Sequence, residues 1–246
     1  MIGQIFFTVL YQPLYNLLVL LYNLAPWGGI GLAIILITVA IKAVLMPLTY
    51  RALKAQKELQ EIQPRIQEIR LQFKDDQEKM ATELMNVYKN HNVNPFAACL
   101  PTLVQLFVFI ALYQALRAGM GEVDPGALYP FIGNPGHMSS MFLWLDLSQV
   151  SVFLAFLAGV TQYFQARQMV TTRPPKVARS EGALDEDMTA SMNKMMVTVL
   201  PLMMFAIGAT TLPGGLTLYI VVSTALTWAM YAYFARAPKI VHKEGE

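Results

Sequence analysis

The sequence predicts an all-α integral membrane protein with five transmembrane helices, and two observations carry this prediction. Hydrophobic residues make up 55% of the chain and charged residues only 14%, whereas a typical soluble domain carries about 25% charged residues. The apolar residues are also gathered into runs long enough to cross a bilayer, which takes roughly 20 helical residues. We expect the spans at 29–50, 95–117, 143–166, 195–212 and 214–235.

The distribution of Lys and Arg predicts the orientation of these spans. Sixteen of the 18 basic residues lie in three segments, 51–93, 167–194 and 236–246. Basic residues accumulate in cytoplasmic loops, so these segments are expected to be two cytoplasmic loops and a cytoplasmic tail. The segment 118–142 is then an external loop, and the N-terminus lies outside. Two basic residues, Lys42 and Arg117, fall outside this pattern.

The first 25 residues are apolar but carry a polar stripe. Its members recur at helical spacing: Gln4, Thr8, Gln12, Asn16 and Asn23. Such a stripe is typical of a helix that lies on a membrane surface. We therefore predict an interfacial amphipathic helix over 1–25, with a sixth span as the open alternative.

The segment 51–93 carries two apolar stripes at helical spacing. The first contains Ile62, Ile66, Ile69 and Phe73, and the second contains Met80, Leu84, Val87 and Tyr88. Two amphipathic helices joined by a short turn predict an antiparallel helical hairpin. Asp75 or Asp76 is placed to cap the second helix. Pro64 marks either a kink in the first helix or its start. The segment 171–190, with Pro174, Pro175 and Gly182, is expected to be a mobile loop.

Signatures of enzymes and of cofactor sites do not occur in the sequence. There is no nucleophile elbow, zinc-protease motif or phosphate-binding loop. Cys99 is the only cysteine, and the three histidines are far apart in the chain. We therefore expect a protein that is not an enzyme and that holds no metal or other cofactor.

Lys42 is the residue most unusual for its place. It lies nine positions before Arg51, which is about 13 Å along a straight helix, and half the hydrocarbon core is about 15 Å thick. One interpretation is a lysine that extends its ammonium group to the membrane edge. The other is a cation facing a water-filled cavity, since charges inside membranes often mark a pathway or binding site.

Polar side chains on the predicted spans are candidates to line such a cavity. They are Thr38, Gln105, Gln162, Gln165, Ser223 and Thr227. Each of them is also explained by an ordinary hydrogen bond between neighbouring helices. No acidic residue within the spans is placed to neutralise Lys42, so water or a transient anionic partner is expected beside it.

Several motifs together resemble the YidC/Oxa/Alb family of membrane protein insertases. They occur in the family's order along most of the chain: Lys42-Ala-Val-Leu-Met-Pro-Leu48, Leu59-Gln-Glu-Ile-Gln-Pro-Arg-Ile-Gln67, Tyr88 with Val93-Asn-Pro95, Leu103-Val-Gln-Leu-Phe107 with Ala111-Leu-Tyr113, and Leu212-Pro-Gly-Gly-Leu216 with Leu218-Tyr219. The resemblance implies a bacterial protein of the inner membrane, with five spans, a preceding surface helix and a cytoplasmic hairpin. The hairpin residues singled out are Pro64, Ile66, Ile69, Met80, Leu84 and Tyr88.

The same resemblance implies insertion and folding of nascent membrane proteins without nucleotide hydrolysis. In the family, a cation in the first span faces a hydrophilic groove, and Lys42 occupies that position. Many bacterial members have Arg there, which can make bidentate contacts. Lys42 carries a point charge instead, so such contacts are not expected here. The expected partners are nascent membrane proteins and lipid; the ribosome, the signal recognition particle receptor and a Sec translocon remain open, and no nucleic acid is read directly.

The chain also departs from the longer members of the family. We expect a short form, with no large extracytoplasmic domain before the core, no additional leading span, and a tail too short for a ribosome-binding extension. Two other classes of function stay open. One is a small-solute transporter or channel lined by Lys42 and Gln105, and the other is an assembly factor that scaffolds other subunits through the hairpin.

Overall fold

The computed structural model describes residues 2–91, 93–119, 123–169 and 195–236, and these are mostly helical. The only strands among them are β1 (Met141–Phe142) and β2 (Leu145–Asp146), which pair antiparallel. The prediction of a helical protein is thereby confirmed for the described residues. The mobile loop predicted over 171–190, Glu122, and the tail beyond Arg236 lie outside the described residues.

The helices follow one another with short connections over most of the chain. Their bounds are α1 (Ile2–Phe6), α2 (Gln12–Leu24), α3 (Gly29–Val44), α4 (Met46–Glu61), α5 (Gln63–Gln72), α6 (Gln77–Asn90), α7 (Pro95–Gly119), α8 (Val152–Met169), α10 (Leu200–Thr210) and α11 (Gly214–Arg236). A π-helical turn at Phe7–Tyr11 joins α1 to α2, and another at Met195–Val199 precedes α10.

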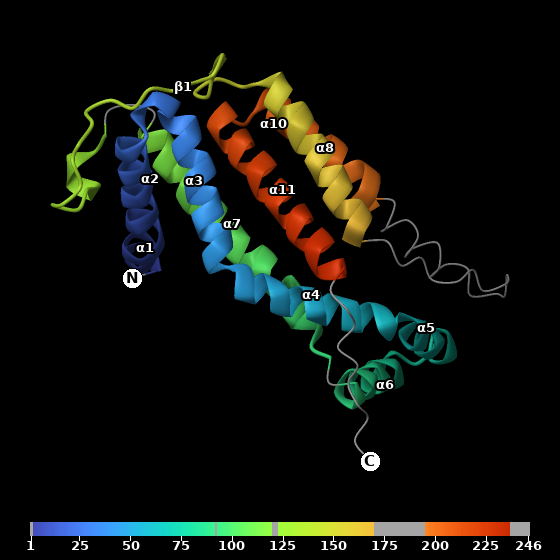
Figure 1. The fold of residues 1–246 in the computed structure, drawn as a ribbon. Coiled ribbons are helices and arrows are strands. Elements are labelled where there is room, and N and C mark those ends of the chain that lie inside the picture. Colours follow the sequence, from blue (N-terminus) through green and yellow to red (C-terminus); the bar gives the residue numbers. More distant parts are fainter. Residues whose placement is uncertain (1, 92, 120–122, 170–194, 237–246) are drawn as a thin grey trace.

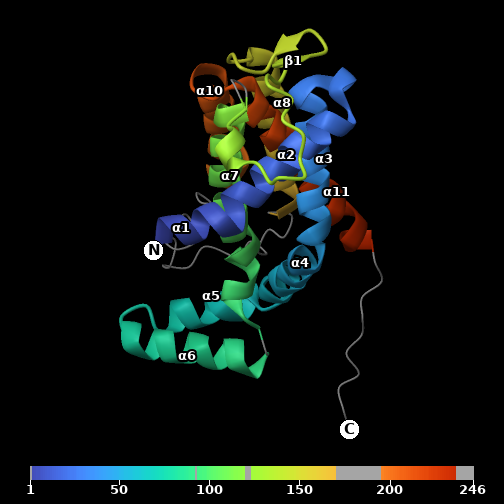
Figure 2. The ribbon, with the colours of Figure 1, turned by 90° about the vertical axis from the view of Figure 1, so that its left-hand side faces the viewer.

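Six of these helices form a bundle, and the hairpin projects from one end of it. α8 packs against α10 and α11, α11 packs against α3, and α2 packs against α3 and α7. The loop with β1 lies at the end of the bundle opposite α5 and α6 (Figures 1 and 2). Fully buried side chains from several helices make the core, among them Tyr15, Leu18, Ile34, Leu112 and Leu216. These contacts hold the helix faces that carry the functional side chains.

Several helices have the length and composition of membrane spans. Gly3–Leu24, Leu100–Gly119 and Gly214–Phe234 satisfy both criteria individually, and α3 with α4 satisfies them as one bent pair. Met195–Thr210 is a shorter apolar helix. The chain therefore has three or four candidate spans by these criteria within the described residues, and the count of five stays a prediction.

The helix predicted over 29–50 is divided at Leu45. α3 and α4 meet there at an angle of 61°. Pro47 explains the break, because its ring clashes with the carbonyl group four residues earlier and it has no N–H to donate. The bend revises the depth of Lys42. With α3 along the membrane normal, Lys42 lies about 9 Å from the level of Arg51 rather than about 13 Å.

The helix predicted over 143–166 begins nine residues later, at Val152. The apolar run at Leu143–Leu145 is the turn between β1 and β2 and the start of β2 instead. Asp146 Oδ1 accepts hydrogen bonds from the backbone N–H and the hydroxyl of Ser148 at 2.9 and 2.7 Å, which turns the chain. Ser151 then caps α8, with its Oγ accepting from the Leu154 N–H at 3.3 Å. Local hydrogen bonding therefore overrides the apolar pattern.

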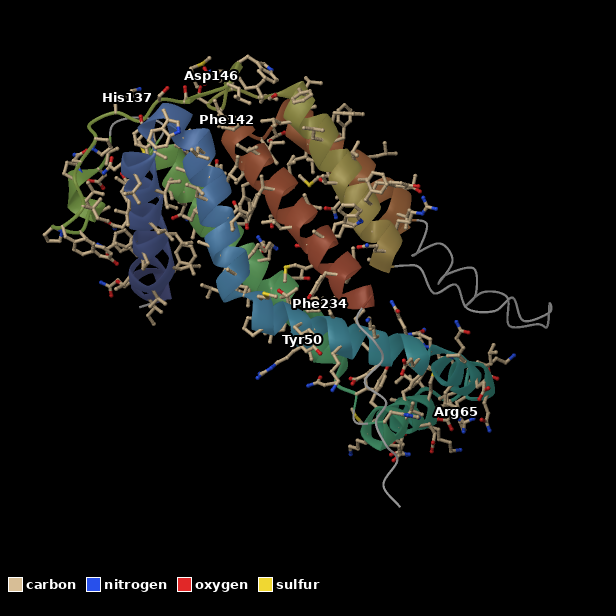
Figure 3. The ribbon with its side chains drawn as sticks, in the orientation of Figure 1. Tyr50, Arg65, His137, Phe142, Asp146 and Phe234 are labelled. Carbon is tan, nitrogen blue, oxygen red and sulfur yellow. The ribbon has the colours of Figure 1, made fainter. Side chains whose placement is uncertain are left out.

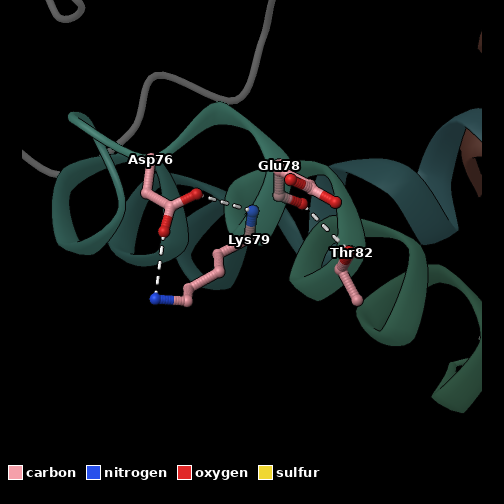
Figure 4. A network of polar contacts seen from close by, with 4 residues as sticks. All are labelled: Asp76, Glu78, Lys79 and Thr82. Carbon is pink, nitrogen blue, oxygen red and sulfur yellow. Dashed lines mark hydrogen bonds and ion pairs between the residues drawn. The ribbon is translucent and has the colours of Figure 1, made fainter.

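Within the segment 51–93, where a hairpin was predicted, α5 packs against α6, whereas residues 51–61 belong to α4. Pro64 is the second residue of α5 and so marks its start rather than a kink. Asp76 caps α6: Oδ1 accepts from the Lys79 N–H at 3.1 Å, and Oδ2 lies 3.0 Å from Lys79 Nζ (Figure 4). These contacts to Lys79 lower the pKa of the Asp76 carboxyl. Of the two capping candidates, Asp76 is the cap.

Candidate functional site: a polar network around Lys42

Side chains from three helices meet at Lys42. The Lys42 ammonium on α3 donates to Gln105 Oε1 on α7 at 3.1 Å and to Thr227 Oγ1 on α11 at 2.9 Å. These three residues are far apart in the chain, and the bundle brings them together. Lys42 thus links α3 to α7 and to α11.

The network continues beyond Gln105 and has a consistent hydrogen-bond direction. Gln105 accepts from Lys42 through its oxygen and donates to the Tyr219 hydroxyl through its nitrogen. Tyr219 and Ser223 lie one turn apart on α11. Thr227 donates its hydroxyl proton to the Ser223 carbonyl at 2.8 Å, which leaves its lone pairs for Lys42. Both polar side-chain atoms of Gln105 and the hydroxyl of Thr227 therefore take part in hydrogen bonds.

The cation in this network is bound only by neutral groups. Among the described residues no Asp or Glu lies within 4.0 Å of Lys42, and the three ion pairs are all in α4, α5 and α6 or at their ends. The hydrogen bonds that the ammonium donates to these neutral oxygens orient it but do not cancel its charge. An anionic group that approaches to about 4 Å would gain on the order of 4 kcal/mol near a protein surface.

The Lys42 side chain turns toward its partners inside the bundle rather than toward the end of the bundle near the hairpin. Thr227 lies seven residues before Phe234, about 10 Å along α11. Phe234 packs edge-on against Tyr50 of α4 with ring centroids 5.0 Å apart (Figure 3). The Lys57 ammonium also donates to the Phe234 carbonyl at 3.0 Å. The end of α11 is thus fixed to α4, and the ammonium of Lys42 lies at the level of Thr227, well inside that end.

The predicted cavity-lining residues have different places in the structure. Gln105 and Thr227 belong to the network, and Ser223 takes part through its backbone carbonyl. Thr38 is only 1% exposed and donates to the Ile34 carbonyl of its own helix at 2.6 Å. Among the hydrogen bonds of the described residues, none links Gln162 or Gln165 to the network. The role of all six residues in lining a groove stays a prediction.

Tyr219 was not among the candidates selected from the sequence. It is 2% exposed and stands one turn before Ser223 on α11. Tyr219, Ser223 and Thr227 recur at intervals of four residues, so they share one helix face. This spacing is the signal that would have identified Tyr219.

Five of the six hairpin residues selected from the sequence belong to the hairpin's own core, and the sixth, Pro64, is exposed. Ile66 and Ile69 are 2% and 3% exposed, and Met80, Leu84 and Tyr88 pack against them. Polar side chains such as Arg65 lie on the outside (Figure 3). The buried set stabilises the hairpin, and its part in binding a substrate stays a prediction.

The polar stripe of the first helix contacts the loop that follows α7. Asn16 is 2% exposed; its Nδ2 donates to the Ala127 carbonyl at 2.8 Å, and its Oδ1 accepts from the Tyr129 N–H at 2.7 Å. Gln12 and Asn23 bind backbone carbonyls of the same loop. Binding of this loop explains three of the five stripe residues without a membrane surface.

Comparison with known proteins agrees with this architecture. A family model described as "60Kd inner membrane protein" matches residues 21–241, which is most of the chain. The chain belongs to this family. Its apolar helices and this membership place it in the bacterial inner membrane as a multi-pass protein.

Curated relatives of this family share the name "Membrane protein insertase YidC". One from Pelobacter propionicus is 33% identical over 228 residues, covering 92% of this chain and 38% of the relative. One from Burkholderia vietnamiensis is 37% identical over 232 residues, covering 93% and 36%. One from Clostridium tetani is 35% identical over 175 residues and 71% of each protein. The resemblance to the insertase family is thereby confirmed.

The chain spans less than two fifths of the length of the first two relatives. The matched part nevertheless includes Lys42, Gln105, Tyr219, Ser223 and Thr227, because all five lie within residues 21–241. The polar network therefore lies within the segment that the family model matches.

Proposed function

We propose that this chain is a membrane protein insertase that takes nascent membrane proteins as its substrates. The observation that carries the proposal is the Lys42 ammonium, bound by Gln105 and Thr227 with no acid beside it among the described residues. Its relatives carry the name of membrane protein insertases. We propose further that the chain works by binding and hydration alone, with no covalent step.

The proposed topology has five spans, with the N-terminus outside and the C-terminus in the cytoplasm. The spans are α3 up to its bend, α7, α8, α10 with the turn before it, and α11. α8 has 18 residues, about 27 Å, which is close to the roughly 30 Å of a hydrocarbon core. The basic hairpin then lies in the cytoplasm, as the distribution of positive charge favours.

In this proposal the first helix lies along the outer membrane surface. It runs obliquely past the bundle, from the level of the α3–α4 bend to the end that carries β1 (Figures 1 and 2). Its polar side chains hold the loop between α7 and α8. Its exposed side chains Ile5, Val9 and Leu24 would contact lipid.

The proposed mechanism places a water-accessible groove around Lys42. The hydrophilic flank of a nascent segment enters this groove from the cytoplasm and is attracted by the ammonium where the flank is acidic. Partial hydration lowers the cost of moving polar groups part of the way across the bilayer. The apolar segment then moves into lipid, and the burial of its apolar surface there drives release.

The hairpin is the proposed first contact for the incoming chain and for its delivery partners. Leu71 and Met85 are exposed apolar residues on α5 and α6 that suit a transient apolar contact. We extend the proposal to the ribosome, the signal recognition particle receptor and a Sec translocon as partners at this surface.

Reconstitution of the purified chain tests the proposed function. Proteoliposomes that contain only this protein should insert a single-span substrate with a short acidic flank, measured by protease protection of the translocated flank, whereas empty vesicles should not. The same vesicles should show no flux of small solutes. Solute flux without insertion would identify a transporter or channel instead.

A further inference from the structure

Arg117 is the one basic residue outside the cytoplasmic segments that the Lys42 network does not involve. It lies in the last turn of α7, two residues before Gly119. This end of the bundle is opposite the hairpin. A cation in this position interacts favourably with the helix dipole, and this interaction explains why a charged residue is stable at the helix end. That interaction does not account for the cavity beside it.

The cavity lies between α7, α11 and the segment that leads to α8. It has a volume of about 210 Å³ and is lined by Tyr113, Leu116, Arg117, Ser148, Pro213 and Leu216. A cavity needs only about 10–15 Å³ to hold one water molecule. The space is therefore large enough for a chemical group of several atoms.

Two hydrogen-bond donors line this cavity. Tyr113 and Arg117 are one turn apart on α7, so their side chains share one face. Neither makes a hydrogen bond or ion pair to any other residue that the structure describes. Ser148 already donates its hydroxyl to Asp146 and can only accept. None of the described residues that line the cavity is acidic. The group that completes this site is therefore an acceptor, and the guanidinium favours an anion.

We propose that this cavity binds the phosphate of a phospholipid in the leaflet opposite the hairpin. A guanidinium binds phosphate oxygens through two parallel hydrogen bonds, and the Tyr113 hydroxyl supplies a third donor. This inference rests on the proposed function only for the orientation of the chain, which decides whether this leaflet is the outer one.

The position and the lining favour a lipid over a soluble anion. Arg117 lies at the end of the candidate span Leu100–Gly119, where headgroups lie. Leu116, Pro213 and Leu216 form an apolar lining that suits the start of an acyl chain. At the same end of the bundle Leu143 and Trp144 are more than 70% exposed, and tryptophan prefers the membrane interface. A choline group would bring a second cation near Arg117, so phosphatidylglycerol should bind more tightly than phosphatidylcholine.

Lipid binding to the purified full chain tests the site. In neutral detergent, native mass spectrometry counts the phosphatidylglycerol molecules that remain bound as the lipid is titrated. Arg117→Gln should weaken the tightest binding event by about tenfold or more, as loss of charged hydrogen bonds predicts. Arg117→Lys should have an intermediate effect and Tyr113→Phe a smaller one.

A matched variant controls for net charge. Arg70 is an exposed cation in the last turn of α5 on the hairpin, and Arg70→Gln should bind the lipid as the wild type does. Without lipid, Arg117→Gln should unfold at the wild-type temperature. Equal lipid retention by Arg117→Gln and the wild type would overturn the site, as would equal losses in Arg117→Gln and Arg70→Gln.

Two further measurements separate the possible sources of phosphate and the two proposals. Inorganic phosphate at millimolar concentration should not displace the lipid; if it does, the site is one for a soluble anion. Insertion by Arg117→Gln in proteoliposomes reports on the proposed function independently. Lost lipid binding with retained insertion supports this site, and retained lipid binding with no insertion by the wild type contradicts only the proposed function.

Discussion

The Lys42 ammonium lies 2.9 Å from the Thr227 hydroxyl, although 185 residues separate them in the chain. Thr227 gives its own proton to the Ser223 carbonyl, so it meets Lys42 as an acceptor. The contact joins α3 to α11 and leaves the positive charge without an acidic partner among the described residues.

Replacing Thr227 should weaken the network, whereas replacing Thr38 should not. Thr227→Val keeps the side-chain volume but removes one of the two acceptors of Lys42, which costs about 1–3 kcal/mol when a charged donor loses its partner. Thr38→Val removes only a hydrogen bond within its own helix, worth about 1 kcal/mol or less. Thermal unfolding in detergent measures both. Equal losses of stability would contradict the assigned role of Thr227.

Asn16 should contribute more to stability than Asn23. Asn16→Leu leaves the Ala127 carbonyl and the Tyr129 N–H without these partners in a buried place, at a cost of about 2–4 kcal/mol. Asn23 makes one exposed hydrogen bond to the Gly133 carbonyl, so Asn23→Leu should cost less than about 1 kcal/mol. Limited proteolysis of the loop 123–140 checks the difference. Identical cleavage rates in the two variants would show that Asn16 does not hold the loop.

Gly29 is required where the chain enters α3. Its φ is +57°, and a Cβ placed there would lie 2.3 Å from the Met141 carbonyl oxygen. Gly29→Ala should therefore destabilise the protein by about 2 kcal/mol or more through backbone strain and displacement of β1. Gly3→Ala is the control, because nothing lies within 4 Å of a Cβ at that position. A similar unfolding temperature for the two variants would rule out this constraint.

The cap of α6 should weaken in acid. The contacts to Lys79 lower the pKa of Asp76 below its ordinary value of 3.8. The ionised carboxylate therefore stabilises α6 fully above that value, and the contribution is lost as the pH falls through the folded-state pKa. Hydrogen exchange of the Lys79 amide should be faster in Asp76→Ala than in the wild type, by more than the substitution changes the exchange rate of that amide in an unfolded chain. Asp75→Ala is the control, and an equal acceleration there would contradict the cap.

The sequence predicted those parts of the fold that depend on local pattern. The stripes through Ile66 and Met80 have helical spacing, and they pack as the α5–α6 hairpin because an amphipathic helix must bury its apolar face. Gln105 and Thr227 were selected as polar residues in apolar runs, and both bind Lys42. A polar group in such a run has few alternatives to a partner on another helix.

The features that sequence reasoning missed depend on competing hydrogen bonds or on distant contacts. The polar stripe of the first helix pairs with a loop more than 100 residues away, which no periodicity reveals. Thr38 satisfies its hydroxyl within its own helix, an option open to any helical threonine. The late start of α8 depends on the turn at Asp146, which the apolar run around it concealed.

Charge reversal at Lys42 tests the central claim most directly. Insertion of two single-span substrates that differ only in an acidic or a neutral flank should be compared in proteoliposomes carrying wild-type, Lys42→Arg, Lys42→Gln or Lys42→Glu protein. We expect Lys42→Arg to retain insertion, Lys42→Gln to lose part of it, and Lys42→Glu to insert the acidic-flank substrate at least tenfold more slowly. The neutral-flank substrate should be affected much less. Equal insertion of the acidic-flank substrate by Lys42→Glu and the wild type would contradict the claim that this cation attracts the substrate.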